Sequence, residues 1–414
     1  MKTADLLIVN ASELVVLYGS KSPRRGREMS ELGVINDGAL AIRNGKISAV
    51  GVTSAIKNEF KTSKTIDAKG KVVTPGLIDA HTHLIFAGSR EKEFELRIKG
   101  TSYLDIAKAG GGINATVEKV RKTSKKELKA IAKRRLAEML KLGTTTAEVK
   151  SGYGLNLDDE IKCLEIVKEL NKEQPITIVP TFMGAHDVPP EFKNRTGEYV
   201  NFICDKVIPI IAKKKLAKFC DIFCEDVVFD IAESRQVLTT AKKFGLIPKI
   251  HADEFKPIGG TELAVELEAS SAEHLLNITD RGILALKNSS TIAVLMPATA
   301  FFLGGKYAPA RRLMEENIPV AIASDFNPGS SMTYNMQLVM TIACTQMKML
   351  PSEALTAATI NAAHSLLVGD KIGSLEPGKA ADIVIWDAPS YRYISYHFGE
   401  NHVWAVIKNG KRVV

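Results

Sequence analysis

Two histidines separated by one residue follow an apolar segment of the chain, in Gly76-Leu-Ile-Asp-Ala-His-Thr-His83. Side chains at i and i+2 of a strand point to the same face, so we expect the imidazoles of His81 and His83 to face one way. His251 and Asp325 end two later apolar segments. Imidazole nitrogens together with one carboxylate suit a borderline metal ion, with zinc favoured over iron. The residue types therefore predict a metal site formed by His81, His83, His251 and Asp325.

A metal ion in such a site leaves a position for water and lowers the pKa of that water to about 7, which makes hydrolysis the expected reaction. Glu254 follows His251 by three residues. We expect it to take a proton from the water and to pass it to a leaving nitrogen. The alternative for Glu254 is a solvent-facing loop residue or an acid at a helix N-terminus. His274, which ends another apolar segment, is expected to be a catalytic auxiliary that orients the water or stabilises the oxyanion.

The segment that must position these residues runs from about 73 to 371 and alternates apolar strand candidates with helical stretches, a pattern typical of parallel βαβ units. Eight strand candidates predict an α/β fold with a (β/α)8 barrel, whose active groups lie at the C-terminal ends of the strands. The eight candidates end near His83, Lys150, Phe182, Glu225, His251, His274, Met296 and Asp325.

Short strand candidates separated by turns occupy the two ends of the chain. Asn44-Gly45 and Asn409-Gly410 are typical of tight hairpins, because these residues tolerate positive φ values. Neither end is long enough to bury a sheet face alone. We therefore expect 1–72 and 372–414 to pair into one composite β-sandwich domain, and 73–371 to form the barrel domain.

The composition of the 414 residues, 45% hydrophobic and 25% charged, is that of a folded globular protein and excludes global disorder. The net charge of +8 does not by itself identify a partner. Basic runs such as Lys213-Lys214-Lys215 are interleaved with apolar residues at helical spacing, so we interpret them as solvated helix faces and expect no nucleic-acid binding. No apolar run reaches the roughly 20 residues of a membrane span, and the start lacks a signal-peptide pattern. We expect a cytoplasmic protein without a membrane partner.

Several motifs resemble those of known hydrolases. Pro75 to His83, followed far downstream by Ser374-Leu-Glu-Pro-Gly-Lys-Ala-Ala-Asp382, resembles the amidohydrolase superfamily, and the resemblance covers nearly the whole chain. Four further motifs are similar, in the same order, to those of the imidazolonepropionase family within it. These motifs are Glu148-Val-Lys-Ser-Gly-Tyr-Gly154, Gly184-Ala-His186-Asp, His251-Ala-Asp-Glu254 and Ser324-Asp325-Phe-Asn327-Pro-Gly329-Ser330.

This resemblance implies a (β/α)8 barrel joined to a composite β-sandwich, and metal ligation by the same four residues. It also implies hydrolytic ring opening of 4-imidazolone-5-propanoate to N-formimidoyl-L-glutamate in histidine degradation. Arg90 would then anchor the propionate, because its planar guanidinium matches a carboxylate. The substrate contacts that the resemblance implies are Arg90, Tyr153, His186, Glu254, Asn327, Gly329 and Ser330.

The expected cofactor is one divalent or trivalent metal ion per chain, zinc or iron. Superfamily members with two metals usually bridge them with a modified lysine from the fourth strand, and Phe219 to Glu225 has no lysine at its end, so a mononuclear site is expected. The resemblance also implies a homodimer and a small anionic substrate.

Three alternatives stay open. An aminohydrolase of the same fold, such as a cytosine-type or guanine-type deaminase, also uses a histidine followed by a glutamate, and it would release ammonia. A non-catalytic scaffold would ordinarily lose metal ligands. A nucleic-acid binder would show affinity that falls steeply with salt.

Overall fold

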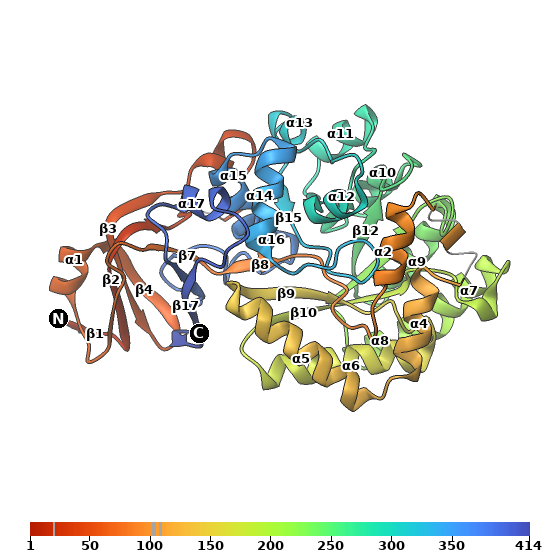
Figure 1. Ribbon diagram of the computed structural model, residues 1–414, viewed down its shortest axis with the longest axis horizontal. Coiled ribbons are helices and arrows are strands. Elements are labelled where there is room, and N and C mark those ends of the chain that lie inside the picture. Colours follow the sequence, from red (N-terminus) through yellow and green to blue (C-terminus); the bar gives the residue numbers. More distant parts are fainter. Residues whose placement is uncertain (20, 102–104, 107–109) are drawn as a thin grey trace.

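The structure is a computed structural model that describes residues 1–19, 21–101, 105–106 and 110–414. Figure 1 shows a large α/β part at one end and a smaller β part, which contains both chain termini, at the other. Two eight-stranded sheets form the cores of these two parts.

The larger part is built on a parallel sheet in which strands β8 to β15 pair in chain order. A parallel bridge between Thr82 and Phe326, just beyond β8 and β15, links the first strand region to the last. The prediction of a (β/α)8 barrel is therefore confirmed. The strands are β8 (Leu77–Asp79), β9 (Thr144–Lys150), β10 (Thr177–Ala185), β11 (Phe219–Cys224), β12 (Ile247–Ala252), β13 (Ser271–His274), β14 (Ile292–Leu295) and β15 (Val320–Ile322).

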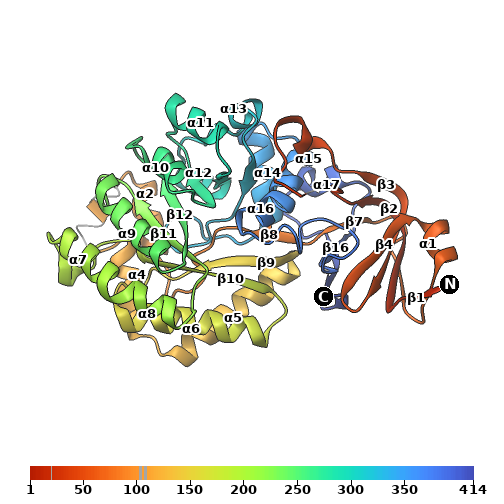
Figure 2. The ribbon, with the colours of Figure 1, turned by 180° about the vertical axis from the view of Figure 1, so that it is seen from behind.

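Helices cover the outside of this barrel, as Figures 1 and 2 show from opposite sides. In α5 the Ser124 hydroxyl caps the first turn by accepting the Glu127 backbone N–H, and Gly143 follows the helix with a φ of 94°. The helices of this part are α2 (Glu91–Ile98), α4 (Ile113–Lys122), α5 (Lys125–Lys141), α6 (Leu157–Glu173), α7 (Thr196–Phe202), α8 (Ile208–Lys213), α9 (Ile231–Lys243), α10 (Gly260–Glu266), α11 (Asp280–Lys287), α12 (Pro297–Leu303), α13 (Ala310–Glu315), α14 (Met336–Met347), α15 (Pro351–Ala357) and α16 (Ile360–Ser365).

The smaller part joins the two ends of the chain, as predicted. Seven strands of its sheet have the order β18-β17-β16-β7-β2-β3-β4, and the eighth, β6, pairs with β2 in parallel. The antiparallel pair β7–β16 connects the N-terminal strands to the C-terminal ones. Asn44 and Gly45 make the β3–β4 turn with φ values of 52° and 73°. The elements are β1 (Lys2–Thr3), β2 (Leu6–Val15), β3 (Val34–Arg43), β4 (Lys46–Val52), α1 (Thr53–Glu59), β5 (Phe60–Lys61), β6 (Thr65–Asp67), β7 (Val72–Pro75), β16 (Ile383–Trp386), α17 (Tyr391–Tyr396), β17 (Val403–Lys408) and β18 (Lys411–Arg412).

Strand β7 belongs to the smaller sheet and β8 to the barrel, so the chain passes from one sheet to the other around Gly76. The division into domains 1–72 plus 372–414 and 73–371 stays a prediction.

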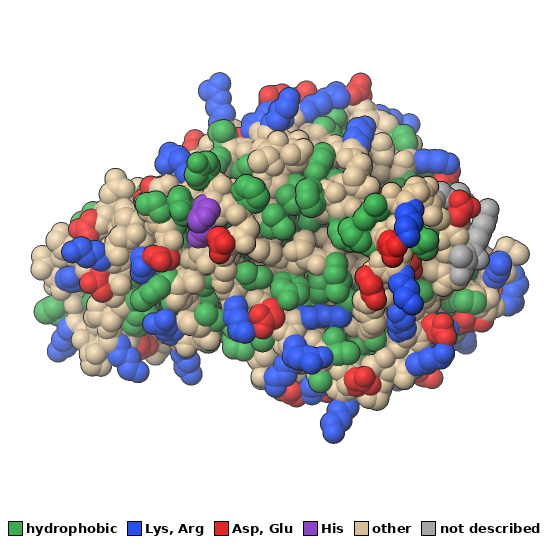
Figure 3. Space-filling view, viewed as in Figure 1, with side chains coloured by type: hydrophobic (Ala, Val, Ile, Leu, Met, Phe, Trp, Pro, Cys, Tyr) green, Lys and Arg blue, Asp and Glu red, His purple; other side chains and the backbone are tan. Residues whose placement is uncertain are grey.

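The basic helix faces carry ion pairs with acidic side chains. Lys125 and Lys129 of α5 each contact Glu169 of α6, at 2.9 and 2.7 Å. On the face drawn in Figure 3, basic side chains are interspersed with acidic and uncharged ones. Within the described part of the chain, none of the helices combines the length and apolar character that a bilayer crossing requires.

Candidate active site

His81 and His83 lie just beyond β8, whereas the sequence predicted them within the strand. The ladder between β8 and β9 ends at the pair Asp79 and Ala147. The chain stays extended because Thr82 bridges to Phe326 and its hydroxyl donates to the Glu148 carbonyl oxygen at 2.7 Å. The extended backbone keeps the two imidazoles on one side. His81 and His83 therefore face the same way, as expected, although the strand is shorter than predicted.

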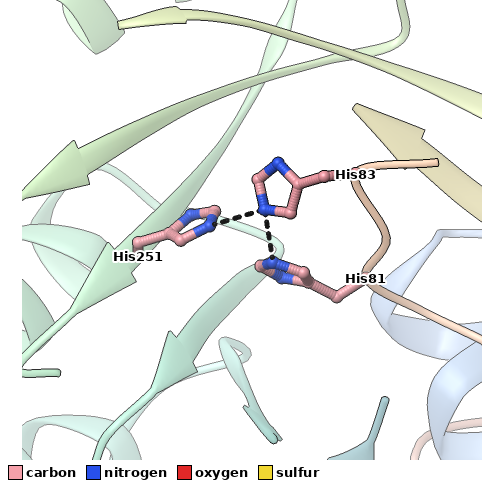
Figure 4. Close-up of side chains that lie close together, drawn as sticks. All are labelled: His81, His83 and His251. Atoms are coloured by element: carbon pink, nitrogen blue, oxygen red, sulfur yellow. Dashed lines mark hydrogen bonds between the residues drawn. The ribbon is translucent and has the colours of Figure 1, made fainter. Parts of the chain in front are cut away.

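Three imidazoles meet at the C-terminal end of the barrel. The Nε2 atom of His83 lies 3.3 Å from Nε2 of His81 and 3.4 Å from Nε2 of His251, which comes from β12. Figure 4 shows these three nitrogens directed toward one another. The other ring nitrogen of His81 lies 2.5 Å from Oε2 of Glu273, and that of His251 lies 3.1 Å from Oδ1 of Asp221. Nδ1–H donation to these carboxylates leaves the Nε2 lone pairs directed at the shared point.

Asp325 completes this group from the segment after β15. Its Oδ1 lies 3.4 Å from Nε2 of His81 and 3.5 Å from Nε2 of His83. Its other oxygen accepts a hydrogen bond from the Thr299 hydroxyl at 2.7 Å, which fixes the carboxylate plane. The neighbouring imidazoles outweigh burial and lower the pKa of Asp325, so the carboxylate stays ionised.

The cluster is compatible with a single metal ion. The ring nitrogens of His81, His83 and His251 lie within 4.8 Å of one another, and Oδ1 of Asp325 approaches Nε2 of His81 and of His83 to 3.4 and 3.5 Å. Imidazole nitrogens and a carboxylate oxygen are the donors that zinc and iron accept. Burial and Lys150 oppose a charged His81 ring, but Glu273 and Asp325 outweigh them and raise its pKa to about 9. Without a metal ion the His81 ring is therefore protonated at neutral pH, and a bound cation would take the place of the proton on Nε2.

Glu254 lies at the rim of this group, in the loop after β12. The Glu225 carboxylate accepts the backbone N–H groups of Phe255 and Lys256, and the Asn277 amide donates to the Glu254 carbonyl oxygen at 2.7 Å. The Glu254 side chain is thus held inward and is 9% exposed. Burial, followed by repulsion from Asp325 and Glu225, raises its pKa to about 8. A carboxyl group with this pKa can both accept and release a proton near neutral pH.

His274, the last residue of β13, faces Glu254. Its Nδ1 lies 3.7 Å from Oε1 of Glu254, and neither of its ring nitrogens has a hydrogen-bond partner among the described residues. Burial lowers the pKa of His274 to about 3, so the ring is neutral. A buried neutral imidazole without partners has capacity left for a ligand in the cavity.

A cavity of about 370 Å³ opens onto this group. All the predicted site residues except His81 line it, together with four apolar side chains that the sequence did not single out, Ile113, Phe223, Phe255 and Leu303. His186 stacks on His83 with ring centroids 4.7 Å apart and directs Nδ1 to the Gly152 carbonyl oxygen at 2.9 Å. Tyr153 lies beside His186, with centroids 5.1 Å apart. The cavity therefore offers aromatic walls as well as polar groups.

Arg90 lines the same cavity and lies just before α2. Its Nε and Nη2 donate to one oxygen of Glu93, while Gly329 lies against its Nη1. Arg97, from α2, lines the same cavity.

Asn327 shapes the loop after Asp325. Its Oδ1 accepts the backbone N–H groups of Gly329 and Ser330, and its Nδ2 donates to the Asp325 carbonyl oxygen and the Ser330 hydroxyl. Each polar atom of the amide is therefore engaged within the loop. Ser330, whose hydroxyl accepts from Asn327, also lines the cavity.

Sequence reasoning missed the side chains that orient the donors, namely Asp221, Glu273 and Thr299. Asp221 and Glu273 are fully buried charged residues inside strands β11 and β13. Charged residues within otherwise apolar strand segments are the signal that could have identified them, since such residues are rarely buried without a partner.

Comparisons with known proteins identify the family of this chain. The amidohydrolase family model matches residues 72–413. The imidazolonepropionase of Geobacillus kaustophilus is 50% identical over 99% of this chain and 98% of the relative. The imidazolonepropionase of Fusobacterium nucleatum is 50% identical over 99% of both chains, and that of Alkaliphilus metalliredigens is 48% identical over 99% of this chain and 98% of the relative.

Solved structures share the fold at low sequence identity. An adenosine deaminase from Xanthomonas campestris has a TM-score of 0.71 at 21% identity, with 99% of this chain and 93% of that chain covered. The guanine deaminase of E. coli has a TM-score of 0.73 at 14% identity, with 100% and 98% covered. Because the family model spans most of the sequence and the curated relatives match it end to end, the chain belongs to the amidohydrolase family and, within it, to the imidazolonepropionases.

Proposed function

We propose that this chain hydrolyses 4-imidazolone-5-propanoate to N-formimidoyl-L-glutamate, a step of histidine degradation. The observation that carries the proposal is one cavity that is lined by Arg90 as well as by Glu254 and the imidazole group. An anionic arm and a hydrolysable ring bond are the two features that such a cavity can recognise. The names of the relatives, at 47–50% identity, support the same reaction.

The proposed metal centre consists of His81, His83, His251 and Asp325. The donor set of three imidazoles and one carboxylate supports a single ion, zinc or iron, and we propose zinc first. When bound, such an ion supplies Lewis-acid chemistry, because it polarises a carbonyl oxygen and lowers the pKa of water to about 7.

Glu254 is the proposed proton shuttle. The carboxylate accepts a proton from the water that attacks the ring carbonyl carbon, and it delivers that proton to the ring nitrogen that departs from the same carbon. The C–N bond breaks, the carbonyl carbon becomes a carboxyl group that releases its proton to solvent, and the second ring nitrogen carries the formimidoyl group. His274, neutral and 3.7 Å from Glu254, donates to the developing oxyanion.

The remaining residues of the cavity are proposed to select the substrate. Arg90 binds the propionate carboxylate through the guanidinium edge that Glu93 leaves available. Tyr153 and His186 flank the ring, and Ser330 contributes its hydroxyl from the loop that Asn327 holds. Gly329 keeps the backbone close to Arg90.

The test is a hydrolysis assay on the purified chain. Loss of imidazolone absorbance and appearance of formimidoylglutamate by mass spectrometry are expected to coincide, and a chelator should abolish both. Restoration by added Zn²⁺ or Fe²⁺ would identify the ion. Release of ammonia without a ring-opened product would instead establish an aminohydrolase, and a chain with far less than one metal ion and no hydrolysis would be a scaffold.

The homodimer and the cytoplasmic location expected from the sequence belong to this proposal. Light scattering behind size-exclusion chromatography tests the first, because a dimer has twice the chain mass of 45.1 kDa. Fractionation of the native cells tests the second.

A further inference from the structure

Five charged side chains are enclosed in the barrel beneath the imidazole group. They alternate with apolar residues on strands β9, β11, β12 and β13, and each has an exposure of 0%. The five are Glu148, Lys150, Asp221, Lys249 and Glu273. Removal of an ion from water costs several kcal/mol unless the ion is paired. Apolar side chains ordinarily fill this layer of a barrel, so the charges require a reason.

Lys150 is the centre of this group. Its Nζ donates to Oε1 of Glu148 at 2.7 Å, to Oδ2 of Asp221 at 2.7 Å and to Oε2 of Glu273 at 3.1 Å. A lysine ammonium has three N–H donors, so the three carboxylates use its full capacity.

Two of these carboxylates also hold site histidines. Oε2 of Glu273, which Lys150 contacts, lies 2.5 Å from Nδ1 of His81. The Asp221 carboxylate binds Lys150 through Oδ2 and His251 through Oδ1, at 3.1 Å. One ammonium group therefore lies a single carboxylate away from two separate imidazoles, one after β8 and one on β12.

We propose that Lys150 is a positioning residue for the metal centre, which it organises by fixing the Asp221 and Glu273 carboxylates that orient His251 and His81. The inference rests on the proposed function, because it assumes that these imidazoles bind a cation. Lys150 is not among the described residues that line the cavity, so it acts through the two carboxylates and does not touch the substrate.

Lys249 fixes the same arrangement from the other side. Its Nζ contacts Oε1 of Glu273 at 2.7 Å and donates to the carbonyl oxygen of Ala80, the residue before His81, at 3.3 Å. The Ser271 hydroxyl adds a donor to Oε1 of Glu273 at 2.9 Å. The Glu273 carboxylate thus has donors on both oxygens, which leaves its orientation toward His81 no freedom.

The test compares Lys150→Met with Lys408→Met in the full chain. Lys408 is a matched control, because its Nζ pairs with Asp382 at 2.5 Å in the smaller sheet and both side chains are 3% exposed. Both variants lose a buried ion pair, so both are expected to be less stable. Cation affinity is measured with Zn²⁺ by chelator competition, and ligand geometry by the absorption spectrum of bound Co²⁺.

We expect Lys150→Met to lose about 10- to 100-fold in Zn²⁺ affinity and to change the Co²⁺ spectrum, as removal of outer-shell partners does elsewhere. Lys408→Met should keep the affinity and spectrum of the unaltered chain. Affinity and spectrum that are unchanged in Lys150→Met, or equally changed in both variants, would overturn the inference.

If Lys150→Met does not fold, the Zn²⁺ affinity of Asp221→Asn provides the test instead. The amide keeps the size of the side chain and leaves Glu148 and Glu273 as partners of Lys150, but it breaks the charged link to His251. A Zn²⁺ affinity within twofold of the unaltered chain would overturn the inference. If the unaltered chain binds no cation, the proposed metal centre and this inference are both wrong. If the unaltered chain binds one ion and the variants bind it equally well, only this inference is wrong.

Discussion

Arg90 and Glu93 form a two-point contact in which Nε and Nη2 of the guanidinium donate to the same carboxylate oxygen, at 2.9 and 2.7 Å. The second oxygen of Glu93 accepts the backbone N–H of Gly112 at 3.2 Å. One edge of the Arg90 guanidinium is therefore held by the protein, and the edge formed by Nη1 and Nη2 is the one left for a substrate carboxylate. Glu93 also reduces the rotameric freedom that Arg90 would lose on binding.

Substitution of Arg90 by glutamine should weaken binding of the propionate. A hydrogen bond to a charged group contributes about 1.5–3 kcal/mol, which corresponds to a loss of about 10- to 150-fold in kcat/KM, expressed mainly in KM. Steady-state kinetics on Arg90→Gln provide the measurement. Arg90→Lys is the control, because lysine keeps the charge but lacks the planar pair of donors. Its kcat/KM should lie between those of the unaltered chain and of Arg90→Gln. An unchanged KM in Arg90→Gln would contradict the assignment and favour a neutral substrate.

Substitution of Glu254 by glutamine should lower kcat by about 10²- to 10⁴-fold, the usual contribution of a proton shuttle, with little change in KM. The base must be ionised to accept a proton, so kcat/KM of the unaltered chain should rise with pH through the pKa of Glu254. That pKa is about 8 without an ion. A bound cation favours the carboxylate and moves the rise to lower pH.

The pH profile of Glu254→Gln should lack this rise. Glu262→Gln is a suitable control, because Glu262 is an acid of the next helix, α10, with a side chain that is 22% exposed. If kcat/KM of Glu254→Gln rises with pH in the same way as that of the unaltered chain, the rise comes from the titration of another group.

The stability of the metal-free protein should also report on Glu254. Its folded pKa of about 8 is raised from 4.5, chiefly by burial. Below pH 4.5 the group is protonated in both the folded and the unfolded state. As the pH rises toward 8, only the unfolded state ionises freely, so the folded state loses stability relative to Glu254→Gln.

Urea unfolding of both chelator-treated proteins at pH 5 and pH 9 tests this sign. The free energy of unfolding of Glu254→Gln minus that of the unaltered chain should be larger at pH 9 than at pH 5 by on the order of a few kcal/mol. Each pKa unit is worth about 1.36 kcal/mol. Other titrating groups cancel in the difference between the two proteins. A difference that does not depend on pH would mean that Glu254 is solvated.

Much of the fold could be predicted, because its signals are local. Asn44-Gly45 and Asn409-Gly410 make tight turns wherever they follow a strand, and both do so here. Eight apolar segments indicated the barrel. The extent of the strands could not be predicted in the same way. The regular ladder of β8 ends at Asp79, although Thr82 beyond it still accepts the Lys150 backbone N–H of β9 and also bridges to Phe326 after β15.

The imidazole group was also accessible from the sequence, since a barrel brings the ends of its strands to one face. The orienting carboxylates were not. Glu273 contacts His81, 192 residues away, and only closure of the barrel brings that pair together. Asp221 contacts His251, 30 residues away, across the neighbouring strands β11 and β12, and this contact depends on the register between them. The role of Glu93 in holding Arg90 is likewise apparent only from the structure. A glutamate three residues after an arginine ordinarily forms a surface ion pair of small effect.

Gly329 provides the last prediction. A Cβ atom at this position would lie 2.3 Å from Nη1 and 2.8 Å from Cζ of Arg90, and its nearest contacts are all atoms of that side chain. A separation below van der Waals contact must be relieved, and the flexible guanidinium can move more readily than the backbone. Gly329→Ala should therefore displace Arg90 and raise KM for the propionate substrate by about tenfold, the equivalent of roughly 1.4 kcal/mol, while kcat and thermal stability change little. Gly305→Ala is the matched control, because a Cβ there meets nothing within 4 Å. The double variant Arg90→Gln with Gly329→Ala should then bind no more weakly than Arg90→Gln alone, since the glycine acts only through the arginine; an additive loss would mean that Gly329 contacts the substrate itself.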